Sequence, residues 1–208
     1  MKTIATIFIA FLSLTAMAQD KYEAGMQKAF DLWDQDKTSD AINVFERIAT
    51  VETKNWKPAY YVSLLNVLES FGEKDEAVLI AKLNKAQDFM NNAKSLASNN
   101  VDVMMLEGLY YTAWVAYDGQ RYGMQYSSKI SKLYKEASKL EPDNPRVVLG
   151  RAEWNIGLAS YFKQPIDAFC EDIERAIKLG KDWKPTEKFA PSFQEDRAKE
   201  VLKKSCGK

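Results

Sequence analysis

The chain has 208 residues, with 29 basic and 29 acidic side chains, two cysteines and no histidine. This length suits one domain, or at most two small ones, with a substantial buried core. A net charge of zero argues against nucleic acid or an anionic membrane as the main partner, because both attract a basic excess. The lack of histidine excludes His-based triads and His-containing metal sites. An apolar content of 46% excludes a disordered chain. The composition therefore indicates a globular protein with few of the groups that catalysis uses.

The first eighteen residues have the pattern of a secretory signal peptide. Lys2 provides a short basic region, residues 4–14 are almost entirely apolar, and residues 16–18 form a small-x-small cleavage site. The apolar stretch is shorter than the roughly 20 residues that a transmembrane helix needs. We therefore expect cleavage after Ala18 and an exported protein, periplasmic or secreted, with no membrane span.

Helical periodicity dominates residues 20–180. It predicts helices around residues 29–33 and 41–49, and then over 57–71, 75–97, 100–117, 124–140, 144–161 and 166–179. Gly72 is expected to end one of these helices, and Asn144 to cap another whose first turn contains Pro145. Because no segment shows the alternation typical of strands, we predict no sheet. Two prolines after residue 181 indicate an extended loop, and a polar helix is expected over 192–203.

A short pattern recurs in the helices that close each pair. A small or apolar residue is followed by a large one four positions later and another small or apolar one three positions after that. The three clear copies are Ala41, Phe45 and Ile48, then Ala86, Met90 and Ala93, then Ile130, Tyr134 and Ala137, with a poorer fourth in Phe169, Ile173 and Ala176. The opening helices align at the same shift of about 44 residues, which places Gly108 over Ala152. A small residue there would let the partner helix approach, and the large residue would fill the space between pairs.

These residues resemble the tetratricopeptide repeat (TPR). The second-helix signature of that family is matched by Ile130, Tyr134, Ala137 and Pro142, and part of its first-helix signature by Gly108 and Tyr111. The resemblance covers roughly residues 22–180, but the period is about 44 instead of about 34. It implies an all-α array of about four antiparallel helix pairs, and a generic helical bundle is the alternative.

The resulting domain organisation has three parts. We expect a signal peptide at 1–18, a TPR-like helical repeat domain at 19–180, and a C-terminal extension at 181–208 packed on the last helix pair. With its export signal and C-terminal cysteine segment, the chain also resembles uncharacterised secreted TPR-like proteins of the Bacteroidetes. That likeness implies a fold and a compartment but no activity.

Cys170 and Cys206 form an even pair in a chain that is expected to reach an oxidising compartment, so a disulfide is the default expectation. It would close a loop of about 36 residues, worth on the order of 4 kcal/mol in the chain-entropy model. A redox or metal-binding pair is the alternative. The sequence has neither a Cys-x-x-Cys motif nor a histidine to support it.

The sequence contains no recognisable catalytic constellation. It has no glycine-rich phosphate loop and no Gly-x-Ser-x-Gly motif. The segment from Asp34 begins like a calcium loop, but Ser39 and Phe45 stand where the loop needs Gly and Glu. We therefore expect no catalytic residue, no metal site and no cofactor.

The TPR resemblance implies that the opening helices line a concave binding face. Its expected partner-binding residues are Tyr60, Leu64, Asp102, Met105, Leu109, Arg146, Leu149 and Glu153. This apolar set with a few charges suits an extended peptide or protein segment. The leading hypothesis is therefore an exported, non-catalytic interaction module for a protein or peptide of unknown identity.

Two alternatives remain open. One is a small-molecule or glycan binder that uses Tyr and Trp as stacking platforms. The other is a hydrolase, which would need two carboxylates about 5–10 Å apart in a cleft.

Overall fold

The computed structural model describes residues 19–207. The predicted signal peptide at residues 1–18 and its cleavage site at Ala18 lie outside these residues. Within the described residues every regular element is a helix, which confirms the all-α prediction.

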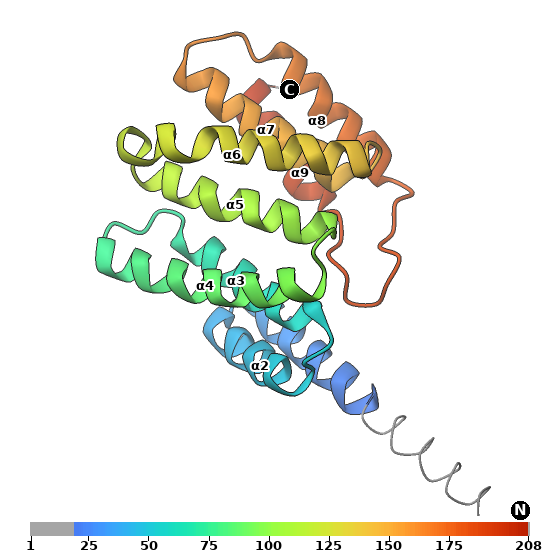
Figure 1. Cartoon of the computed structure of the whole chain (residues 1–208). Helices are drawn as coiled ribbons and strands as arrows, with labels where there is room; N and C mark the ends of the chain where they lie inside the picture. Colours follow the sequence, from blue (N-terminus) through green and yellow to red (C-terminus); the bar gives the residue numbers. More distant parts are fainter. Residues whose placement is uncertain (1–18, 208) are drawn as a thin grey trace, which may run out of the picture.

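The helices form an array of antiparallel pairs. A helical segment over residues 19–34 is followed by α2 (Thr38–Val51), α3 (Trp56–Ser70), α4 (Glu76–Leu96), α5 (Val101–Tyr117), α6 (Gly119–Leu140), α7 (Pro145–Tyr161), α8 (Asp167–Gly180) and α9 (Glu195–Cys206). Helices adjacent in the chain pack on each other, and the pairs α3–α4, α5–α6 and α7–α8 lie one above the other (Figure 1). The identity of these pairs as TPRs stays a prediction.

Asx capping sets where several helices begin. Asn144 accepts a hydrogen bond from the backbone N–H of Arg146, and Pro145 occupies the first turn of α7, as the sequence predicts. Asp118 accepts from the N–H groups of Gln120 and Arg121. With Asp118 as its N-cap, α6 begins at Gly119, so the predicted start at residue 124 is wrong.

Loss of the Asn144 cap should have a measurable cost. Replacing a capping Asn by Ala typically costs about 1 kcal/mol of stability, so Asn144→Ala should lower the free energy of unfolding by about that amount in urea titrations. Asn91→Ala on the exposed face of α4 is the matched control and should change it by less than about 0.5 kcal/mol. Equal effects of the two variants would contradict the capping role.

The repeated large residue packs between helix pairs as the sequence predicts. Tyr134 of α6 lies between α5 and α7: a Cβ built on Gly108 would meet its Cε2 at 3.2 Å, and a Cβ built on Gly150 would meet its Cε1 at 3.0 Å. The equivalent residues Phe45, Met90 and Ile173 are buried as well. These contacts merge neighbouring pairs into continuous cores, one of which extends from the first helix to Trp154.

The chain after α8 connects the two ends of the array. It leaves α8, passes beside the lower helices and returns to α9 (Figure 1). On the way the ring of Phe189 stacks on Phe30 at a centroid distance of 5.8 Å, and its carbonyl accepts a hydrogen bond from the hydroxyl of Tyr61 at 3.0 Å. Glu187 and Lys188 form ion pairs with residues near the start of the array. The C-terminal segment therefore joins the first helix pairs to the last.

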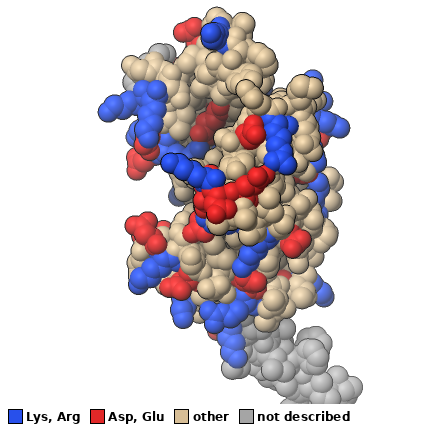
Figure 2. Space-filling model, turned by 90° about the vertical axis from the view of Figure 1, so that its left-hand side faces the viewer, with Lys and Arg blue, Asp and Glu red and all other residues tan. Residues whose placement is uncertain are grey.

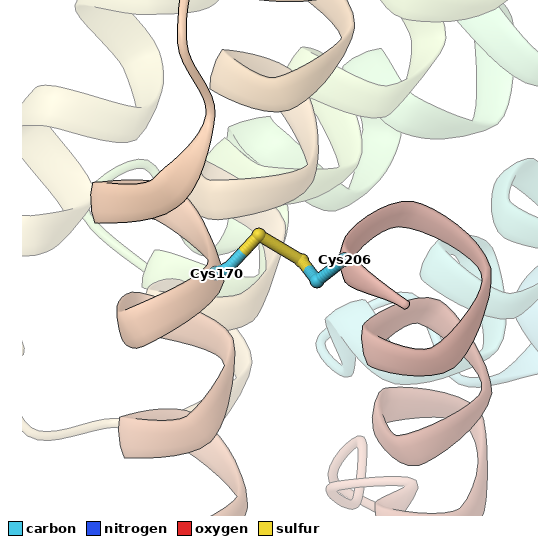
Figure 3. Close-up of a disulfide and its surroundings, with 2 residues drawn as sticks. All are labelled: Cys170 and Cys206. Carbon is cyan, nitrogen blue, oxygen red and sulfur yellow. A yellow bond between two sulfur atoms is a disulfide. The ribbon is translucent and has the colours of Figure 1, made fainter. Parts of the chain in front are cut away.

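A disulfide connects Cys170 of α8 to Cys206 near the end of α9, as predicted (Figure 3). Its S–S distance is 2.05 Å, and the two cysteines are 36 positions apart in the sequence. Ala198 of α9 is fully buried in a second core with residues of α7 and α8. The bond and this core together hold α9 in place, and a disulfide is consistent with an exported protein.

Candidate functional site

An open, mostly apolar cavity of about 970 Å³ lies where α3, α5 and α7 end and α6 begins. We call this cavity the end groove. Its walls come from the end of α3, the second half of α5, the first half of α6 together with Tyr134, and α7 from Gly150 onward, with one residue from α9. Figure 2 views this end of the molecule and shows an indented outline with basic and acidic side chains interspersed around it.

Large exposed apolar side chains concentrate in the end groove. Ten are exposed in the described part of the chain, and five of them line this cavity: Leu68, Phe71, Met124, Tyr161 and Phe162. Met124 is 97% exposed, and the rings of Tyr161 and Phe162 pack edge to face at the rim. A gathering of exposed apolar side chains in one cavity marks an interaction site, whereas scattered ones need no explanation.

Two glycines in the walls leave space that the chain does not fill. Gly123 lies in α6 and Gly157 in α7, and a Cβ added at either would meet no other atom within 4 Å. Glycine inside a helix costs about 1 kcal/mol relative to alanine. Packing within the protein does not explain this cost at Gly123 and Gly157, because both face open space. Gly123 and Gly157 therefore leave the walls of the end groove open at these two positions.

Charge within the lining of the end groove is confined to one ion pair. Glu153 of α7 accepts two hydrogen bonds from the guanidinium of Arg197 on α9, at 3.1 and 2.5 Å. Burial raises the pKa of Glu153 above its ordinary value, while Arg197 acts in the opposite direction. Folding therefore disfavours the charged form of Glu153 on balance. Its contribution to stability falls as the pH rises from the unfolded-state pKa to the raised pKa of the folded chain.

The residues predicted to form a concave binding face divide into separate groups. Leu109 and Glu153 line the end groove. Arg146 forms an ion pair with Asp102 and donates a hydrogen bond to the hydroxyl of Tyr60 at 3.3 Å.

Three predicted residues remain. Leu64 and Met105 are partly buried against the main core, and Leu149 is 5% exposed within the second core. The structure therefore brings two of the eight predicted residues into the groove and joins three others to one another.

The end groove also contains residues that the sequence did not predict as site residues, among them Met124, Gly157 and Arg197. Gly123 and Gly157 did carry a signal, because glycines inside strongly helical segments call for an explanation. Arg197 carried none, since its place in the groove depends on how α9 folds back onto α7. Within residues 19–207 no cluster of three or more His, Cys, Asp or Glu could hold a metal ion.

Comparison with solved structures identifies a similar fold. The HusA haemophore from Porphyromonas gingivalis matches with a TM-score of 0.75 over 89% of this chain and 92% of that one, at 21% sequence identity. At this level of identity the likeness concerns the fold. No protein-family model and no curated protein matches the chain. Among residues 19–207 no helix has the length and apolar character needed to cross a membrane.

Proposed function

We propose that this protein is an exported, non-catalytic binding protein whose end groove holds a flat, largely apolar ligand of the porphyrin class. The observation that carries the proposal is the lining of the groove, which is apolar apart from a few neutral polar groups and the Glu153–Arg197 pair. Its volume of about 970 Å³ falls at the upper end of the range for small-molecule sites. A porphyrin has two apolar faces and acidic groups along one edge, which suits such a lining.

The fold likeness to a haemophore supports the same ligand class. The sequence contains no histidine, so it supplies no imidazole to coordinate a haem iron. In this proposal affinity comes mainly from contact between the faces of the macrocycle and side chains such as Met124, Tyr161 and Phe162. Metal-free protoporphyrin IX should therefore bind with an affinity similar to that of haemin.

The hypothesis that a peptide binds on the predicted concave face is less well supported. Tyr60, Asp102 and Arg146 are engaged with one another, and Leu149 is buried, so these side chains have little surface to offer a partner. A glycan in the end groove would stack on aromatic rings but would find few polar groups for its hydroxyls. The small-molecule hypothesis is therefore favoured, with an apolar ligand in place of a sugar.

The proposal is tested by titrating the protein with haemin and with protoporphyrin IX, following tryptophan fluorescence and porphyrin absorbance. Both should bind at one saturable site. The variant Tyr161→Ala/Phe162→Ala should weaken binding by about tenfold, because two aromatic contacts of about 0.5–1.5 kcal/mol each are lost. Its stability should stay within about 0.5 kcal/mol, since both rings are exposed.

Leu140→Ala is the matched control, because Leu140 is an exposed apolar residue outside the groove. It should leave affinity unchanged. Failure of the wild-type protein to bind either compound would refute the proposed function. Equal affinity of the Tyr161→Ala/Phe162→Ala variant and the wild type would place the ligand elsewhere.

A further inference from the structure

Arg197 is the one cation among the residues that line the end groove. Its bidentate contact with Glu153 uses one N–H from each terminal nitrogen of the guanidinium. A guanidinium has five N–H donors, so three remain for another acceptor. The side chain of Arg197 is 48% exposed and lines the end groove, so the guanidinium is only partly covered by the protein.

The position of Arg197 is set by structure on both sides of it in α9. Ala198, the next residue, is fully buried between α7 and α8, which fixes the rotation of the helix. The disulfide to Cys170 holds the far end of the same helix. An arginine placed in advance loses less conformational freedom on binding than a free surface arginine does.

Glu153 opposes the binding of an anion at this place. Its carboxylate already accepts from Arg197, and a second carboxylate beside it would experience like-charge repulsion. A ligand acid group would therefore compete with Glu153 for the same guanidinium. Arg197 should therefore raise the affinity for an acidic ligand and Glu153 should lower it. Both should have little effect on the affinity for a neutral ligand.

We propose that Arg197 is the acid anchor of the end groove, binding a carboxylate of an otherwise apolar ligand, and that Glu153 holds this guanidinium while the groove is empty. The inference rests on the proposed function and adds the feature of the ligand that is recognised. It assigns the ligand an acidic edge that points toward α9. It also explains why a charged pair stands in a lining that is otherwise neutral.

The test compares protoporphyrin IX, a diacid, with its uncharged dimethyl ester. Arg197→Gln should lower the affinity for the diacid by about 10- to 100-fold, as expected for a lost hydrogen bond between charged groups. It should change the affinity for the ester by less than about threefold. Glu153→Gln should raise the affinity for the diacid several-fold and leave the affinity for the ester unchanged. Arg197→Lys should recover part of the diacid affinity, because it restores the charge without the bidentate geometry.

Arg175→Gln on α8 is the matched control, since Arg175 forms an exposed ion pair with Asp143 outside the groove. It should change neither affinity. Equal weakening of diacid and ester by Arg197→Gln would reveal a structural role and overturn the anchor, as would no weakening of either. A wild-type protein that binds neither compound would instead refute the proposed function itself.

Discussion

Replacing both Cys170 and Cys206 by serine should lower the free energy of unfolding by about 4 kcal/mol. The reason is the loop of 36 residues that the disulfide closes, because in the chain-entropy model such a cross-link restricts the unfolded chain by about that amount. The native state loses a tether as well, since α9 buries only Ala198 completely. Urea denaturation of the wild type and the double variant measures the difference.

Reductant provides the control for this prediction. It should destabilise the wild type to the level of the double variant and leave the double variant unchanged. A loss below about 1 kcal/mol would contradict the chain-entropy account for this bond. The double variant should also lose affinity for protoporphyrin IX, because α9 would no longer hold Arg197 at the groove. Its affinity for the dimethyl ester should fall less, since the ester has no carboxylate for Arg197 to bind.

A larger side chain in the wall of the end groove should lower the affinity for the ligand without lowering the stability of the protein. Gly157→Leu places a side chain in open space, so the helix should gain up to about 1 kcal/mol from the better propensity of leucine. The same side chain would occupy the volume assigned to the ligand. Porphyrin affinity should fall about 10- to 100-fold, since forcing a group into filled space costs about 1–3 kcal/mol.

Ser160→Leu is the matched control, because it adds the same side chain to an exposed position of α7 outside the groove. It should leave porphyrin affinity unchanged. Wild-type affinity in Gly157→Leu would show that the ligand does not lie against α7. A large loss of stability in that variant would show instead that Gly157 serves the packing of the protein.

The features that could be predicted from the sequence depend on short-range patterns. The cap at Asn144 needs only neighbouring residues, and the packing of Tyr134 against Gly108 follows from a repeated spacing. The pairing of Cys170 with Cys206 follows from the expected compartment and an even count. The cap and the packing of Tyr134 depend on nearby residues. The disulfide could be predicted because two cysteines allow a single pairing.

The end groove could not be predicted in the same way. It assembles the ends of three helix pairs with Arg197 of α9, so its existence depends on the lengths and angles of helices far apart in the chain. Likewise, nothing in the local sequence indicates that Tyr60 and Asp102 are both engaged by Arg146. The family resemblance placed these residues on a binding face, but it carried no information about their contacts within this chain.

Chemical-shift mapping would show whether a porphyrin-class ligand lies in the end groove. Backbone amides of the ¹⁵N-labelled protein would be followed while metal-free protoporphyrin IX is added. The largest changes should fall on the groove walls, at Leu109, Gly123 and Gly157, with Phe30 and Asp40 at the far end of the array unchanged. Changes centred on Tyr60 and Arg146, or no changes at all, would contradict the account.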